Sequence, residues 1–141
     1  MKLFKKMKDG GPESTVTGYW LIESKRLFSA LVLKFDGKSR EAFHNHAFNC
    51  ISWVVKGKLT ETMLDGSIKE YRPSFRPFIT TRKDFHKVDS DGKTFVLTFR
   101  GPWAKAWNEF TNNEHITLES GRKIVGRKAS FVIVDEFYKY P

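Results

Sequence analysis

The segment that decides the fold, residues 37–57, reads GKSREAFHNHAFNCISWVVKG. Residues 43–55 within it are rich in aromatic and β-branched side chains, which favours an extended strand, and Lys56-Gly57 supplies a turn signal at its end. His44 and His46 stand two residues apart in this extended part, so both side chains are expected on the same face. That geometry lets two imidazoles converge on one metal ion, and neutral imidazole suits iron, zinc, copper and nickel.

A third histidine, His86, comes 40 residues after His46, just before another predicted strand that a barrel can bring alongside. Cys50 follows the same alternation as the first two histidines, although a buried cysteine often serves only as a small hydrophobic residue. Glu61 shares this face if a hairpin at residues 56–57 pairs Ser52 with Glu61, whereas a slip of one residue would turn it to solvent. Cys50 and Glu61 are therefore candidate additional ligands, and Glu61 is also a candidate general base.

Other residues are candidates for binding a substrate. Arg40 and Arg100 could clamp an anionic group, or could be ordinary surface charges. Trp103 and Trp107, four residues apart, could stack on a ligand or could pack as one apolar face.

Short segments rich in β-branched and aromatic residues recur along the chain, most of them separated by a glycine turn. Such spacing is typical of an all-β sandwich or barrel, and no long window has helical periodicity. Asp65-Gly66 is a turn signal, while Asp91-Gly92 and Ser120-Gly121 predict hairpins, and residues 103–113 carry the only modest helical or turn signal. The predicted strands are 19–22, 27–35, 43–55, 58–63, 68–71, 78–81, 87–90, 94–100, 116–118, 124–125 and 131–134.

Size and composition predict one folded domain. The chain has 141 residues, and we expect a basic lead over residues 1–14 followed by a single barrel over 15–141. The net charge of +9 would attract nucleic acid or other polyanions non-specifically. A single cysteine excludes an intrachain disulfide, and the sequence contains neither a signal-peptide pattern nor an apolar run that could span a membrane. These features predict a cytoplasmic protein.

The motif in residues 37–57 resembles the first motif of the cupin superfamily, a glycine followed by His-x-His, a glutamate and a second glycine. Gly37, His44, His46 and Gly57 fill four of those places, and Cys50 stands where the glutamate is usual. The second cupin motif, Pro-x-Gly-x-x-His, is matched in residues 81–86 only by the final histidine. The resemblance implies a cupin-type double-stranded β-helix, an RmlC-like jelly-roll barrel with little helix.

Residues 40–107 more closely resemble a set of small cupin proteins common in bacteriophage genomes, which have no assigned reaction. The resemblance lies in an arginine before FHNHAF, then WVVKGKLTE, YRPSFRP, FHKV, TFRGPW and a further tryptophan. It implies a metal site formed by His44, His46 and His86, and a host cytoplasm if the protein is phage-encoded. The metal would be a divalent transition ion such as iron, zinc, manganese or nickel.

Three functions remain open at this level. The first is a metal-binding cupin that catalyses a dioxygenase-like or other reaction on a small molecule. The second is a cupin that binds a small ligand without turnover, with a tryptophan such as Trp103 stacking on it. The third is a basic phage or host interaction protein that acts through its surface, on nucleic acid or an acidic partner. Whether the chain is an enzyme is left open, and a homodimer formed through an exposed sheet edge is a further expectation.

Overall fold

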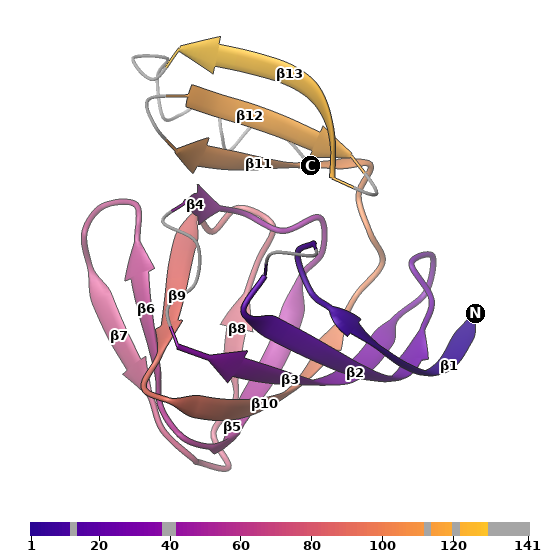
Figure 1. The fold of residues 1–141 in the computed structure, drawn as a ribbon, viewed down its shortest axis with the longest axis vertical. Coiled ribbons are helices and arrows are strands. Elements are labelled where there is room, and N and C mark those ends of the chain that lie inside the picture. Colours follow the sequence, from indigo (N-terminus) through magenta and orange to yellow (C-terminus); the bar gives the residue numbers. More distant parts are fainter. Residues whose placement is uncertain (12–13, 38–41, 112–113, 120–121, 130–141) are drawn as a thin grey trace.

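The computed structural model describes residues 1–11, 14–37, 42–111, 114–119 and 122–129, and these residues form thirteen strands and no helix (Figure 1). The strands are β1 (Lys2–Lys8), β2 (Val16–Glu23), β3 (Ser29–Asp36), β4 (Phe43–His44), β5 (Cys50–Lys56), β6 (Leu59–Met63), β7 (Ile68–Tyr71), β8 (Phe78–Thr80), β9 (His86–Ser90), β10 (Lys93–Arg100), β11 (Ala106–Thr111), β12 (Glu114–Glu119) and β13 (Lys123–Ala129). The predicted strand at 131–134 lies outside the described residues.

Two antiparallel sheets make up the fold. One sheet has the order β1-β2-β3-β10-β5-β8, and the other has the order β13-β12-β11-β4-β9-β6-β7. The chain passes repeatedly from one sheet to the other. Strands far apart in sequence therefore become neighbours, and β3 and β10 pair along their full lengths. This is the all-β jelly-roll arrangement that the sequence predicts.

Two turns predicted to close hairpins join the two sheets instead. β5 pairs with β10 and β8, whereas β6 pairs with β7 and β9, so Gly57 lies on a crossover and residues 52 and 61 do not pair. In the same way, Asp91-Gly92 connects β9 in one sheet to β10 in the other. The glycines do adopt the positive φ that a sharp reversal needs, 94° at Gly57 and 68° at Gly92. A reversal of this kind does not determine which strand the chain pairs with next.

Two other predicted hairpins are present, whereas two predicted elements differ from the structure. Asp65-Gly66 joins β6 and β7 as a hairpin, and β12 pairs with β13 on either side of residues 120–121. Residues 103–113, expected to be helical or a turn, contain β11, which pairs with β12 and β4. The expected long strand over residues 43–55 is two strands in different sheets, because the chain leaves β4 after His44 and enters β5 at Cys50.

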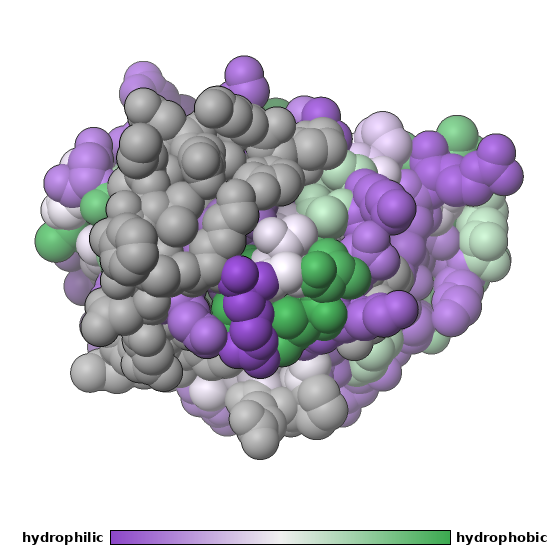
Figure 2. Space-filling model, turned by 90° about the horizontal axis from the view of Figure 1, so that it is seen from above, coloured by the Kyte–Doolittle hydropathy of each residue, from purple (hydrophilic) through white to green (hydrophobic). Residues whose placement is uncertain are grey.

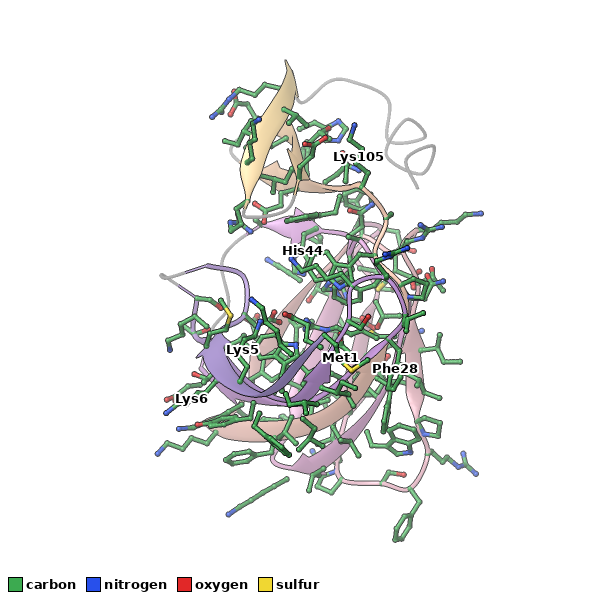
Figure 3. All side chains as sticks on the ribbon, turned by 90° about the vertical axis from the view of Figure 1, so that its right-hand side faces the viewer. Met1, Lys5, Lys6, Phe28, His44 and Lys105 are labelled. Carbon is green, nitrogen blue, oxygen red and sulfur yellow. The ribbon has the colours of Figure 1, made fainter. Side chains whose placement is uncertain are left out.

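The stretch expected as a basic lead contains β1, which forms the edge of the six-stranded sheet and pairs with β2. Alternation places Lys5 and Lys6 on opposite faces of this strand (Figure 3). Lys5 lies over the ring of Trp20 at 4.6 Å and lines the interior pocket, whereas Lys6 lies over Tyr19 on the other face.

The main cluster of the apolar core lies between the two sheets and contains Trp20, Leu31, Leu33, Val54, Leu59 and Val96. Several of these side chains also line the pocket that contains the histidines, so the core forms one wall of the site. Hydrophilic residues cover most of the described surface in the view onto β11–β13, with a group of hydrophobic residues among them (Figure 2). The described residues contain no helix with the length and hydropathy needed to span a membrane.

Candidate metal centre

Three histidines from two neighbouring segments meet in the interior. His44 ends β4 and pairs directly with His86, the first residue of β9, while His46 follows β4 in the loop toward β5. One ring nitrogen from each histidine lies within 4.8 Å of the others. The ring centroids are 4.9 to 5.1 Å apart, and the rings stand edge to face. The structure therefore brings together all three histidines that the sequence singles out.

The hydrogen-bonding pattern determines which nitrogen of His86 faces the others. Its Nδ1 lies 2.5 Å from Oε2 of Glu61, and because a carboxylate only accepts, Nδ1 carries the proton and donates it. In the neutral ring this leaves the lone pair on Nε2, which faces Nε2 of His46 at 2.9 Å. Two imidazole nitrogens this close must share either a proton or a cation.

Glu61 reaches the site through His86. Its other oxygen, Oε1, accepts a hydrogen bond of 3.0 Å from the hydroxyl of Tyr71. Burial alone would raise the pKa of Glu61, but the hydrogen bond and charge of His86, together with the Tyr71 hydroxyl, lower it. Burial and then the adjacent Glu61 carboxylate raise the pKa of Tyr71. The carboxylate is thus ionised and held on both sides, which fixes the orientation of the His86 ring.

The other two histidines are partly buried. Burial, with smaller contributions from His44, His86 and Arg100, lowers the pKa of His46 well below its usual value, which favours the neutral ring. Nδ1 of His44 lies 3.3 Å from the carbonyl oxygen of Ala42. Donation from Nδ1 to this oxygen would place the lone pair of the neutral His44 ring on Nε2.

Asn45 stands between His44 and His46 and attaches the segment from β4 to β5 to strand β11. Its backbone N–H donates to the carbonyl of Asn108 at 3.1 Å, and its side-chain Oδ1 accepts from the backbone N–H of Asn108 at 2.6 Å. The side chain of Asn108 in turn contacts His115 and Thr117, each at 2.9 Å. This buried network, rather than the continuous strand expected over residues 43–55, positions His44 and His46.

The histidines line a pocket of about 830 Å³. Of the residues predicted from sequence, Cys50, Glu61, Arg100 and Trp103 also line it, and Arg40 lies outside the described residues. Among the described residues, the cluster of groups close enough to hold one metal ion contains the three histidines, without Cys50 or Glu61. The Sγ atom of Cys50 lies 4.0 Å from the hydroxyl of Ser52.

An aromatic wall extends from the histidines along the pocket. The ring of Phe48 lies 5.0 Å from His46 and 5.2 Å from Trp103, which in turn contacts Trp107 at 5.9 Å, edge to face. Strand parity gives Phe48 and Cys50 the same predicted face as the histidines, and both line the pocket. Nothing in the sequence marks Asn45 or Tyr71, because their roles depend on pairing with β11 and β7.

Arg100 is the buried cation of this pocket. Its side chain is 4% exposed, and its guanidinium lies 4.4 Å over the ring of Phe48. The carboxylate of Asp9 pairs with it, with 2.7 Å between Nη2 and Oδ2 and 3.3 Å between Nη1 and Oδ1. A polar partner from the first residues of the chain thus reaches the same pocket as the histidines.

A scan of protein-family models and a search of curated proteins give no match. Solved structures do match. An RmlC-like cupin from Shewanella frigidimarina is 19% identical, with a TM-score of 0.55 over 70% of this chain and 84% of that one.

A sugar phosphate isomerase of the cupin superfamily from Silicibacter pomeroyi is 10% identical, with a TM-score of 0.61 over 92% of both chains. The polyketide cyclase RemF from Streptomyces resistomycificus is 13% identical, with a TM-score of 0.59 over 96% of this chain and 85% of that one. At these identities the likeness concerns the fold, and the fold is that of cupins.

Proposed function

We propose that this cupin-fold chain binds one divalent transition metal ion through His44, His46 and His86, and that the metal acts on a small molecule held in the adjoining pocket. One observation carries the proposal: ring nitrogens of the three histidines lie within 4.8 Å of one another in the interior. Three neutral nitrogen donors favour iron, zinc or nickel over manganese, which prefers oxygen ligands.

The chemistry of the donor set fits a metal ion. Three imidazoles would fill part of a coordination sphere and leave at least one position toward the pocket. The proton on Nδ1 of His86 points to Glu61, so that Nε2 is available, as is usual for a ligand histidine backed by a carboxylate. The low pKa of His46 means that a proton would compete weakly with a metal for that ring.

The surrounding residues divide into those that hold the histidines and those that would hold a ligand. A bound metal would supply Lewis acidity or a redox centre to a group coordinated beside the histidines. Glu61 holds the His86 ring, and Asn45 holds the loop with the other two. Phe48 and Trp103 offer flat apolar surfaces in a pocket whose volume suits a small molecule.

Metal analysis of the full chain purified without a histidine tag tests the proposal. We expect close to one equivalent of metal in the wild-type protein and a loss of most of it in His44→Ala. Asn49→Ala is the control, because the Asn49 side chain bonds the backbone of Arg82 in an exposed position and lies outside the cluster of three. Equal metal content in the wild-type and His44→Ala proteins would rule the site out.

The pocket supports a second candidate, the binding of a small ligand without turnover. The aromatic wall and the 830 Å³ volume serve binding with or without reaction. Mass spectrometry of the purified protein after incubation with candidate ligands separates the two functions. A retained and unchanged ligand on the metal-loaded protein indicates binding alone, and a converted ligand indicates an enzyme.

A further inference from the structure

Arg100 is placed to bind a ligand that also reaches the histidines. It ends β10 inside the pocket, and both its guanidinium and the His46 ring lie against the ring of Phe48, at 4.4 Å and 5.0 Å. A guanidinium that is 4% exposed needs an anionic partner, because a buried unpaired charge is strongly destabilising. The group that pairs with Arg100 within the chain indicates which chemical class of ligand can bind there.

The partner within the chain is the carboxylate of Asp9, bound at two points in the fork geometry of an arginine–carboxylate pair. Asp9 lies on the connection between β1 and β2, and its side chain is 28% exposed, far more than that of Arg100. Gly10 and Gly11 follow it with φ values of 95° and 103°. Asp9 is therefore the more exposed half of the pair, on a glycine-containing connection at the pocket wall.

We propose that Arg100 is the subsite for the carboxylate of a small organic acid, and that Asp9 occupies this subsite until the acid displaces it. The inference rests on the proposed function, since it names the class of molecule presented to the metal. In the exchange one carboxylate replaces another, so that Arg100 stays paired throughout. The body of the acid would lie along Phe48 and Trp103, whose rings are 5.2 Å apart, toward the histidines.

Two other cations that line the pocket already hold carboxylates, while Lys8 bonds a threonine hydroxyl and Lys25 lies over the ring of Trp103. Lys5 is bound to Glu23 at 2.6 Å, and Arg122 is bound to Glu109 at 2.9 Å. A phosphate dianion usually requires more than one cationic partner, whereas a single guanidinium matches a single carboxylate. The carboxylate paired with Arg100 is more exposed than those of Glu23 and Glu109, and it lies on the connection between β1 and β2.

Calorimetric titration of the full chain with benzoate tests the proposal. Asp9→Asn keeps the shape of the side chain and removes its charge, so Arg100 becomes available to the probe. We expect benzoate to bind Asp9→Asn about tenfold or more tightly than the wild type, since the apparent affinity of the wild type is reduced by the fraction of Arg100 held by Asp9. Adding Arg100→Lys to Asp9→Asn should abolish that gain, because lysine lacks the two-point fork.

Glu23→Gln is the matched control, because it also removes one carboxylate from the pocket lining but frees Lys5 rather than Arg100. An equal gain in benzoate affinity in this variant would overturn the assignment to Arg100. The assignment would also fail if folded Asp9→Asn bound benzoate no more tightly than the wild type, or if neither protein bound it. It would fail as well if Asp9→Asn gained as much affinity for neutral benzamide, or if inorganic phosphate displaced benzoate as well as benzoate itself does. Metal content measured on the same samples keeps the two proposals separate, because tighter benzoate binding without metal would contradict only the proposed function.

Discussion

The residue on which the site depends most, after the histidines themselves, is Glu61. It binds Nδ1 of His86 at 2.5 Å and thereby directs Nε2 toward the other rings. We expect Glu61→Gln to weaken metal affinity about 10- to 100-fold, the usual cost of removing a carboxylate behind a ligand histidine. Competition titration against a chromophoric chelator measures this affinity directly.

Tyr71→Phe is the control for Glu61→Gln. It removes the 3.0 Å hydrogen bond to Oε1 and leaves Oε2 on His86. We expect it to affect metal affinity less than Glu61→Gln does. Wild-type metal affinity in Glu61→Gln would show that the His86 ring keeps its orientation without the carboxylate.

At this scale the sequence predicts residue types better than their partners. The spacing of His44 and His46 and the position of His86 are visible in the sequence, and the structure places their rings together. Glu61 also lines the interior, but the predicted reason, pairing with residue 52, is wrong, because β6 pairs with β9 and places Glu61 beside Val88. Asp9 could not be found in advance, since its partner Arg100 lies 91 residues away.

Among the elements, β4 is the shortest and depends most on side-chain support. It contributes one pair to β9 and two pairs to β11, so Asn45 supplies much of its attachment. Asn45→Ala leaves the backbone N–H of Asn108 without its acceptor in a buried position, which should cost about 1–3 kcal/mol of unfolding free energy. Urea denaturation measures this loss, and metal affinity should fall with it because His44 and His46 flank the residue.

Asn49→Ala serves as the control for Asn45→Ala. Its Oδ1 accepts from the backbone N–H of Arg82 in an exposed position, where water can replace it. We expect a change within about 0.5 kcal/mol. If Asn45→Ala were as stable as Asn49→Ala, the attachment of β4 would not depend on this hydrogen bond.

The turn at Gly57 carries the chain from one sheet to the other and leaves no room for a side chain. A Cβ atom there would lie 2.4 Å from Oγ1 of Thr94 and 2.8 Å from the carbonyl of Lys93. Oγ1 of Thr94 also bonds both backbone groups of Lys58, so a clash would disturb the crossover itself. Gly66 has a similar φ of 90° with open space around it, which makes it the matched control.

We therefore expect Gly57→Ala and Gly66→Ala to differ in the free energy of unfolding measured in urea. Gly66→Ala should lose about 1–2 kcal/mol, the cost of placing a side chain in the left-handed region. Gly57→Ala adds the clash with Thr94 and Lys93 and should lose more than about 3 kcal/mol. Equal losses in the two variants would mean that the contact around Gly57 relaxes freely.

The strands themselves were easier to predict than their pairing. Aromatic and β-branched runs mark most of the observed strands, because those side chains suit a half-buried pleated surface. Glycine turns mark where the chain reverses, but Gly66 closes a hairpin while Gly57 and Gly92 change sheets. That difference is set by packing between the sheets. Residues 106–111 are a strand where the sequence predicts a helix or turn, because pairing with β12 and β4 outweighs the modest local signal of residues 103–113.

For the whole molecule, the net charge of +9 leaves an interaction with nucleic acid as a prediction. Three cations that line the pocket, Lys5, Arg100 and Arg122, are each paired with a carboxylate within the fold. Any nucleic-acid binding would then come from the remaining exposed lysines and arginines. We expect it to weaken steeply between about 50 and 200 mM salt, because counterion release controls such binding. Affinity for a DNA duplex that stays constant over this range would exclude this mode.

The metal site also lies where the seven-stranded sheet is narrowest, which links ligand binding to the stability of the whole fold. His44 pairs with Glu109 of β11 on one side and with His86 of β9 on the other, so the strands β11–β13 join the rest of their sheet through it (Figure 1). A metal held by His44, His46 and His86 would cross-link β4 to β9 at this seam. Binding to the folded state alone stabilises it by about 2.7 kcal/mol at a free metal concentration 100 times the Kd.

Removal of metal by a chelator should therefore lower the Tm of the wild-type protein by several degrees, and adding the metal back should restore it. Because the cross-link acts at the seam, hydrogen exchange on the metal-free protein should accelerate first in β4 and β11, while β3 and β10, paired along their full lengths, stay protected. His44→Ala should have a Tm that the chelator does not change. A chelator that lowers the Tm of His44→Ala as much as that of the wild type would place the stabilising metal elsewhere. Uniform acceleration of exchange would show that the metal does not act mainly on the pairing of β4 with its neighbours.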